Sequence, residues 1–131
     1  MQSNIDVIKR FFAAWGRDWQ SACREFMTED FECHEPPGLP QGGVFKGWDT
    51  PIRISNIYRA IWDVEYWDMR LSLDESGEVV TTTTMFRWTH KKTGKSCTEP
   101  VTELNYFRGG RICRMVVYHF DLFGVVATMQ P

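Results

Sequence analysis

The spacing of apolar residues changes once along this chain, and that change limits the folds available to it. Up to about residue 61, apolar residues recur every three or four positions, as they do along one face of an α-helix. From Val64 onward they recur at every second position, as they do in strands with one buried face. Helices followed by a run of strands are typical of an α+β domain, in which helices pack on a twisted sheet.

Three helices are expected in the first half of the chain. Ser3 and Asp6 form a capping pair in front of the first, which reaches Trp15. Asp18 is the expected N-cap of the second, which ends by Asp30. The third is expected to begin after Asp49 as its cap, and its apolar positions are Ile54, Ile57, Tyr58 and Ile61.

The second half predicts four strands joined by tight turns that contain glycine. They span residues 64–73, 79–89, 96–107 and 111–121. In the first of these, Trp67 and Met69 fall on the apolar face, and Tyr66 and Arg70 on the other. The result is an antiparallel meander that curves around the three N-terminal helices. We expect one domain over residues 1–131, shaped as a cone with an interior open at one end.

Composition excludes several classes of function. The 131 residues include 15 basic and 17 acidic residues, and the longest basic run is Lys91-Lys92, which argues against a nucleic-acid partner. No apolar run is long enough to span a membrane and the N-terminus is polar, so a soluble cytoplasmic protein is expected. The four cysteines lack the CxxC spacing of zinc sites, and we interpret them as free thiols.

The stretch ECHEPPGLPQGG, residues 32–43, places acid and base side chains directly before a run of proline and glycine. Residues 31–35 should be extended, because a residue before proline is pushed out of the helical region. Alternation points His34 and Glu35 in opposite directions, and we expect Glu35 to face inward, although a bulge beside Pro36 would reverse this. Residues 36–47 are predicted to be a loop that forms the rim of the cone.

Two longer strings resemble the SnoaL-like group of the nuclear transport factor 2 fold, which also contains ketosteroid isomerase. They are FMTEDFECHEPPGLPQGGVFKGWD and GKSCTEPVTELNYFRGGRICRMVVYHFD. The resemblance spans nearly the whole chain and implies the cone-shaped fold. The same fold serves isomerases, cyclases, dehydratases, epoxide hydrolases and binding modules, so the fold by itself does not specify the reaction.

The resemblance also places candidate catalytic residues. Glu35 stands before Pro36, where ketosteroid isomerase has its general base, and Glu103 stands where that enzyme has its second acid. The tyrosine of its oxyanion hole falls on Phe11, which has no hydroxyl group. SnoaL-like cyclases carry an acid–base aspartate in the last strand, which Asp121 resembles by position.

Alternation within the last predicted strand places His119 on the same face as Asp121. The four candidates also have structural interpretations. Glu35 could be an exposed loop residue, Glu103 could pair with an arginine such as Arg87 or Arg114, His119 could be a core residue and Asp121 a surface cap.

These residues predict a cofactor-independent isomerase or cyclase that moves protons on a hydrophobic carbonyl compound, such as a polyketide or terpenoid intermediate. Glu35 would be the base, His119 or Asp121 the proton donor, and Glu103 the group that stabilises charge. The residues expected to contact substrate are Phe11, Trp15, His34, Trp62, Asn105 and Val117. No metal is expected, since no HxH or HExxH spacing occurs.

Two other functions stay open: a dehydratase or epoxide hydrolase on the same fold, and a non-catalytic module that binds a ligand or protein. An epoxide hydrolase of this family would need an acid–arginine–acid set. On any of these functions the resemblance implies a homodimer through the outer face of the sheet, on which we place Tyr66, Arg70 and several threonines.

Overall fold

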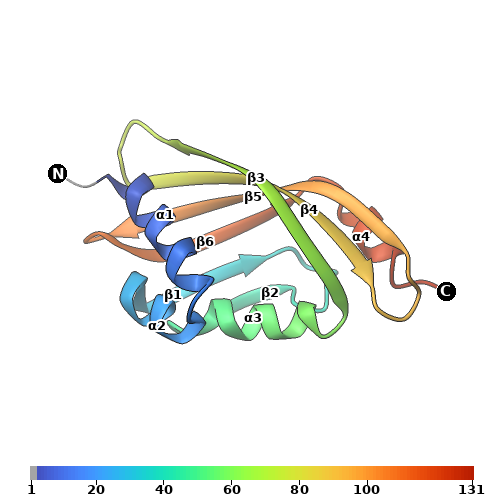
Figure 1. Ribbon diagram of the computed structural model, residues 1–131. Coiled ribbons are helices and arrows are strands. Elements are labelled where there is room, and N and C mark those ends of the chain that lie inside the picture. The colour runs from blue at the N-terminus through green and yellow to red at the C-terminus, as the bar shows by residue number, and fades with distance from the viewer. Residues whose placement is uncertain (1–2) are drawn as a thin grey trace.

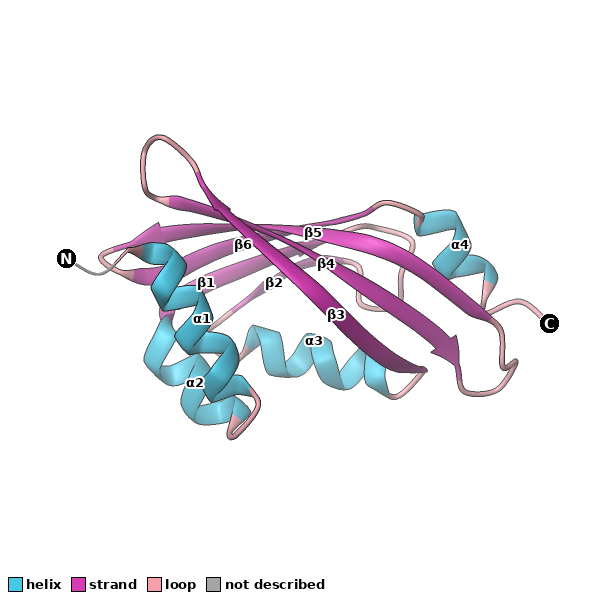
Figure 2. Cartoon of the chain, turned by 45° about the horizontal axis from the view of Figure 1, so that its top comes forward, coloured by secondary structure: helices cyan, strands magenta, loops and turns pink. Residues whose placement is uncertain are grey.

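The computed structural model describes residues 3–131 and has an α+β architecture (Figure 1). Three helices lie along one face of a curved six-stranded sheet, and a fourth lies beyond its far end (Figure 2). The predicted fold class is therefore confirmed. The elements in chain order are α1 Asn4–Trp15, α2 Trp19–Phe26, β1 Met27–Glu35, β2 Gly43–Lys46, α3 Thr50–Arg59, β3 Trp62–Leu73, β4 Val79–His90, β5 Ser96–Arg108, β6 Arg111–His119 and α4 Leu122–Ala127.

Two of the three predicted helix caps are confirmed. The Ser3 hydroxyl accepts a hydrogen bond from the Asp6 backbone N–H, and the Asp18 carboxylate accepts from two backbone N–H groups of α2. Asp49 precedes α3 but its side chain makes no capping bond. Its Oδ1 accepts instead from Arg53 Nε one turn along the helix, at 3.2 Å, because the side chain turns toward that cation.

The sheet has the strand order β2-β1-β6-β5-β4-β3. Strands β3 to β6 form the predicted antiparallel meander. The sheet as a whole is mixed, however, because β1 pairs in parallel with β6, with Cys33 opposite Met115. The parallel pairing places the end of β1, and with it Glu35, next to the end of β6. It brings together the two parts of the chain that carry most of the candidate residues.

The first strand begins four residues earlier than predicted, and the second helix is correspondingly shorter. Residues 27–30 were expected in the helix, but α2 ends at Phe26 and Met27 pairs with Ile112 on β6. A buried apolar residue at position 27 satisfies either a helix or a strand, so pairing with a distant strand decides the conformation.

The segment expected to be all loop contains the short strand β2, which pairs with the end of β1. The remaining loop is folded back on the protein, with Leu39 and Gln41 buried. A Cβ atom on Gly42 would lie 2.5 Å from the Pro36 carbonyl oxygen, so only glycine fits this turn. The loop is thus a fixed feature of the fold.

A bulge in β3 changes which side chains face the helices. The pairing register shifts between Trp67 and Arg70, and Asp68 adopts a positive φ of 55°. As a result Tyr66 and Met69 both face the concave side, although Tyr66 is half exposed, and Trp67 does not. The predicted placement of Tyr66 on the outer face is therefore wrong, because strict alternation does not allow for the inserted residue.

The last strand ends at His119, two residues before its predicted end. Asp121 is the N-cap of α4, and its side chain accepts a hydrogen bond from the Gly124 backbone N–H at 2.8 Å. The helix was not predicted, since its sequence LFGVVA contains glycine and β-branched residues that favour helices weakly. The prediction of a strand that reaches residue 121 is therefore wrong.

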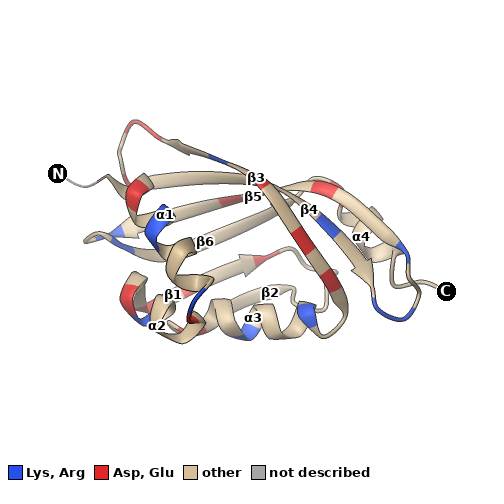
Figure 3. Cartoon of the chain, viewed as in Figure 1, with Lys and Arg blue, Asp and Glu red and all other residues tan. Residues whose placement is uncertain are grey.

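Acidic and basic residues are interspersed over the helices and strands (Figure 3). Across residues 3–131, none of the helices combines the length and apolar character needed to cross a bilayer. The cysteines Cys23, Cys33, Cys97 and Cys113 are all unpaired.

Candidate functional site

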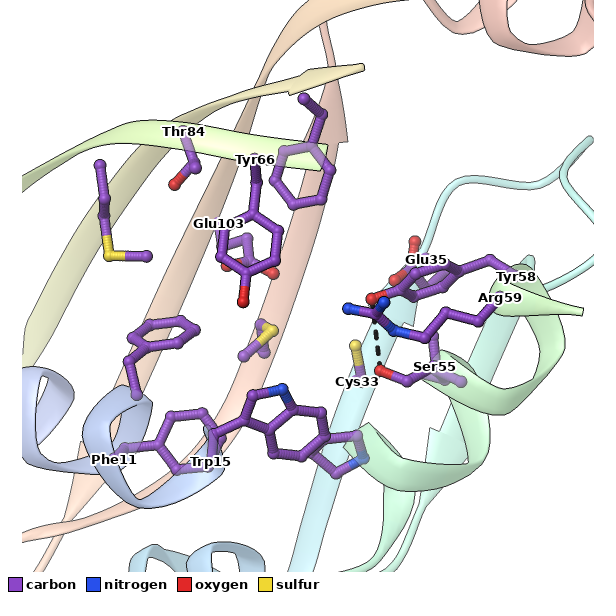
Figure 4. Close-up of a pocket in the computed structure, with 16 residues that line it drawn as sticks. Phe11, Trp15, Cys33, Glu35, Ser55, Tyr58, Arg59, Tyr66, Thr84 and Glu103 are labelled. Carbon is purple, nitrogen blue, oxygen red and sulfur yellow. Dashed lines mark hydrogen bonds between the residues drawn. The ribbon is translucent and has the colours of Figure 1, made fainter. Parts of the chain in front are cut away.

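A cavity of about 110 Å³ lies between the concave face of the sheet and helices α1 and α3. Its lining is mostly apolar, but several polar side chains converge on it (Figure 4). Glu35, Tyr58 and Arg59 lie on the wall formed by β1 and α3, and Tyr66 and Glu103 lie across from them on β3 and β5. An apolar cavity with a few convergent polar groups is the usual form of a small-molecule site.

Glu35 is the last residue of β1, and its side chain is buried in this cavity, 9% exposed. Its Oε2 atom has no hydrogen-bond partner among residues 3–131. Burial, and then the nearby negative charge of Glu103, raises the pKa of Glu35 to about 8. The inward orientation that we expected for Glu35 is the one observed, and its carboxyl group can exchange a proton near neutral pH.

Glu103 lies on β5 and is the second carboxyl group of the cavity. Its Oε1 atom accepts a hydrogen bond from the Thr82 hydroxyl at 3.2 Å. Burial raises its pKa, while Thr82 and His119 oppose that shift. The arginines considered as its partners lie elsewhere, since Arg87 pairs with Glu65 and Arg114 stacks on Tyr106. Within residues 3–131 Glu103 makes no ion pair with an arginine or lysine, and burial favours its protonated form.

Tyr58, which the sequence placed only in the apolar stripe of its helix, supplies a hydroxyl group to the cavity. The Ser55 hydroxyl donates a hydrogen bond to the Tyr58 hydroxyl at 3.3 Å. Burial raises the pKa of Tyr58, so its O–H proton is retained. Because the phenol oxygen accepts from Ser55, its own proton can be donated to a ligand. It provides the kind of donor that Phe11 lacks.

Arg59 was also missed. It is the last residue of α3, and its guanidinium lies beside the rings of Trp19 and Tyr58, at 5.5 and 5.6 Å from their centres. Its Nε is buried and has no hydrogen-bond partner among the residues in the structure. The sequence did contain a signal for this part of the site, because Tyr58 and Arg59 are adjacent at the end of a helix that packs on the sheet.

His119 lies behind Glu35 and does not line the cavity. Its Nδ1 is 2.6 Å from Oε2 of Glu99, and its Nε2 is 4.0 Å from Oε2 of Glu35. Trp88 Nε1 and the Asp121 backbone N–H also donate to Glu99. An ionised Glu99 would accept all three bonds, which requires the proton of His119 on Nδ1, and Nε2 of His119 faces Glu35.

Sequence reasoning missed Glu99, which is fully buried. A signal was present, because Cys97, Glu99, Val101, Glu103 and Asn105 alternate along β5 and every one of these side chains is buried or half-buried. An acid in such a series is expected to have partners.

Other predicted site residues lie elsewhere. The Asp121 side chain caps α4 and is absent from the cavity lining. His34 lies on the opposite side of β1 from Glu35 and pairs with Glu32 at 2.8 Å. Alternation along the strand accounts for this position.

Val117 is buried beside a second hollow, which β1, β6 and the 36–43 loop border. The proline and glycine loop borders that hollow together with Glu35 and His119, and it does not line the 110 Å³ cavity.

Two further residues expected to contact substrate are structural. The Trp62 indole donates to the Thr128 hydroxyl at 2.8 Å within the core. The Asn105 amide donates to the Val80 carbonyl oxygen at 3.1 Å. Both predictions are corrected, because each polar group is bound to the protein itself.

Phe11 and Trp15, which were also expected to contact substrate, line the cavity. Trp15 is also the only one of the six tryptophans, all of them within the described chain, that does so. Across residues 3–131, no three His, Cys, Asp or Glu side chains gather in a way that could hold a metal ion.

Comparison with known proteins identifies the fold. The structure of a nuclear transport factor 2-like protein from Burkholderia xenovorans LB400 aligns with 98% of this chain and 98% of that chain, with 19% identity and a TM-score of 0.85. A similar protein from Burkholderia thailandensis E264 aligns over 100% of both chains, with 24% identity and a TM-score of 0.82.

A third structure, from Jannaschia sp. CCS1, has been assigned provisionally to the SnoaL-like polyketide cyclases. It aligns with 98% of this chain and 92% of that chain, at 17% identity and a TM-score of 0.78. A search of curated protein sequences found no match. The model of the SnoaL-like domain matches residues 8–115, which is most of the sequence. The chain belongs to the SnoaL-like domain family.

Proposed function

We propose that this protein is a cofactor-independent acid–base enzyme, an isomerase or cyclase that acts on a hydrophobic carbonyl compound. The observation that carries the proposal is the pair of buried carboxyl groups, Glu35 and Glu103, on one apolar cavity. Groups with perturbed pKa values that converge in a cavity are typical of active sites. The provisional assignment of similar structures as polyketide cyclases agrees with this class of reaction.

Glu35 would act as the base. Its ionised form removes a proton from the carbon next to the substrate carbonyl, the C–H electron pair becomes the enolate, and Glu35 holds the proton. A base whose pKa is about 8 is strong enough to do this and is ionised in a useful fraction near neutral pH. Returned to a second carbon, the proton completes an isomerisation. If the enolate carbon instead attacks another carbonyl group, a ring closes.

Tyr58 and protonated Glu103 would donate hydrogen bonds to the enolate oxygen. Both are buried and both favour their protonated forms, so they can stabilise the negative charge that develops there. Tyr58 would thus take the place of the hydroxyl group absent at Phe11.

His119 would position Glu35 rather than touch the substrate. Its ring is held between Glu99 and Glu35, with Trp88 packed against it, ring centres 5.6 Å apart. This assignment replaces the expectation that His119 or Asp121 donates a proton directly.

The cavity limits the size of the substrate. Its volume is about 110 Å³ and its lining is mostly apolar. This suits a compact ketone, or one part of a larger polyketide or terpenoid that extends toward partly exposed Tyr66 and Arg59.

Proton exchange tests the proposal without knowledge of the natural substrate. The wild-type protein and Glu35→Gln are incubated in D₂O with compact ketones such as 2-tetralone, and α-proton exchange is followed by NMR. We expect the wild type to accelerate exchange and Glu35→Gln to lose about 10²-fold or more of that acceleration. Exchange no faster than in buffer for every ketone, or equally fast with Glu35→Gln, would overturn the proposal and favour a non-catalytic binding module.

A hydrolase or dehydratase is the second candidate, favoured by one observation. Arg59 lines the cavity together with Glu35 and Glu103, which supplies the cation that an acid–arginine–acid set requires. Small epoxides in ¹⁸O-labelled water distinguish the two, because a hydrolase incorporates the label into a diol and an isomerase does not.

A further inference from the structure

Arg59 differs from Arg53, on the same helix, in having a buried donor nitrogen without a hydrogen-bond partner in the described chain. Arg53, on the same helix, binds the Asp49 carboxylate, the Thr50 hydroxyl and the Lys46 carbonyl oxygen. The Arg59 side chain makes no hydrogen bond or ion pair with any residue of the described chain, and its Nε is buried. A buried donor that is left unpaired lowers stability, so its presence at a cavity wall indicates a ligand group that pairs with it.

The position of Arg59 is fixed by packing. Its guanidinium lies beside the Trp19 and Tyr58 rings, and Trp19 is itself stacked on Trp15 with ring centres 4.6 Å apart. Aromatic side chains therefore hold the planar group at the cavity wall while its N–H groups stay available. The arrangement suits recognition of a planar anion, which Nε and one terminal nitrogen can bind together.

The charges around the cavity also favour a ligand with one negative charge. Its two carboxyl groups, Glu35 and Glu103, have raised pKa values and favour their uncharged forms. Arg59 is then the one formal charge among the residues that line the cavity in the described chain. One guanidinium neutralises one carboxylate, whereas a phosphate group carries nearly two charges and would call for a second cation.

We propose that the ligand of this cavity carries a carboxylate bound by Arg59, so that the substrate is a compact apolar keto acid. The inference rests on the proposed function only in placing the substrate in this cavity. The carboxylate would lie against Arg59 on the α3 wall, and the apolar part would lie among Phe11, Trp15 and Phe86. The binding of the carboxylate also orients the reacting carbonyl relative to Glu35.

A matched pair of probes tests this by binding alone. 4-Phenylbutanoate and its methyl ester have the same apolar body, and only the first carries a charge. Affinities are measured by calorimetry for the wild type and for Arg59→Met. We expect the wild type to bind the carboxylate about tenfold or more tightly than the ester, and Arg59→Met to lose that preference while its affinity for the ester changes by less than about threefold.

Two further variants show that any loss is specific to Arg59. Arg59→Lys keeps the charge but not the planar fork, and it should retain only part of the preference. Arg53→Met removes a charge from the same helix away from the cavity, and it should retain all of it. Thermal unfolding of each variant shows that it is folded. A wild type that binds the carboxylate no better than the ester, or a folded Arg59→Met that keeps the preference, would overturn the inference.

Glu35→Gln separates this inference from the proposed function. We expect it to bind 4-phenylbutanoate with the wild-type preference although it fails to exchange ketone protons. If exchange depends on Glu35 but the carboxylate preference is absent, the keto-acid inference fails and the proposed function stands. If the preference is present without exchange, the cavity binds carboxylates and the enzymatic proposal fails.

Discussion

Glu35 and Glu99 are both buried glutamates on either side of the His119 ring, yet their surroundings differ. Glu99 accepts hydrogen bonds from Trp88, His119 and the Asp121 backbone, so both of its oxygens have partners. Glu35 leaves Oε2 without one and faces an apolar cavity. Burial alone therefore does not determine what a carboxyl group does.

The two carboxyl groups differ in the number of hydrogen-bond donors around them. A carboxylate with three donors is stable in the interior, and it holds His119 and the start of α4 in place. A carboxyl group without donors favours its protonated form and is available for proton transfer. The same residue type thus serves as a structural anchor at one end of the ring and as the candidate base at the other.

Replacing Glu99 should have the largest effect on stability. In Glu99→Gln, an amide N–H₂ faces groups that are themselves donors, so we expect the free energy of unfolding to fall by about 3 kcal/mol at pH 7. Glu35→Gln replaces a carboxyl group that is mostly protonated in the folded protein but ionised in the unfolded chain at this pH, so it should raise the free energy of unfolding rather than lower it. Urea unfolding of both variants measures this, and equal losses would remove the contrast between the two residues.

The pH dependence of stability isolates Glu35. Its pKa is raised in the folded protein from 4.5 to about 8, so between these values the folded state binds more protons than the unfolded state. The stabilisation is fully present below about pH 4.5 and is lost as the pH rises to 8, by at most about 1.4 kcal/mol per pH unit. The wild type should therefore lose stability relative to Glu35→Gln as the pH rises. A constant difference from pH 5 to 8 would contradict the raised pKa.

Tyr58→Phe tests whether a second residue of the cavity takes part in catalysis with Glu35. It removes the hydroxyl proposed to stabilise the enolate but leaves Glu35 in place, so ketone exchange should fall about 10²-fold with little loss of stability. Tyr118→Phe, an exposed tyrosine outside the cavity, is the matched control and should exchange at the wild-type rate. Equal rates for both variants would exclude Tyr58 as a donor.

Much of the fold could be predicted because it depends on local signals. The caps at Ser3 and Asp18, the change of hydrophobic spacing and the glycine turns specify two helices and the meander. The beginning of β1 and the existence of β2 depend on pairing between distant segments, which local spacing does not report. The proposed homodimer stays a prediction, and light scattering at micromolar concentration would test it.

The site was predictable only in part. Glu35 and Glu103 followed from the resemblance to ketosteroid isomerase, and both line the cavity. Tyr66 was placed on the wrong face because of the bulge in β3, and Asp121 proved to be a cap because β6 ends before it. Tyr58 and Arg59 resemble ordinary residues of an amphipathic helix until the position of that helix over the sheet is known.

The most direct test of the role of Glu35 is a ¹³C NMR titration of the side-chain carboxyl groups in the wild type and Glu35→Gln. We predict one carboxyl resonance with a midpoint near pH 8 that is absent from Glu35→Gln. If every carboxyl group of the wild type titrates below about pH 5, Glu35 is an ordinary acid and the account of the site is wrong.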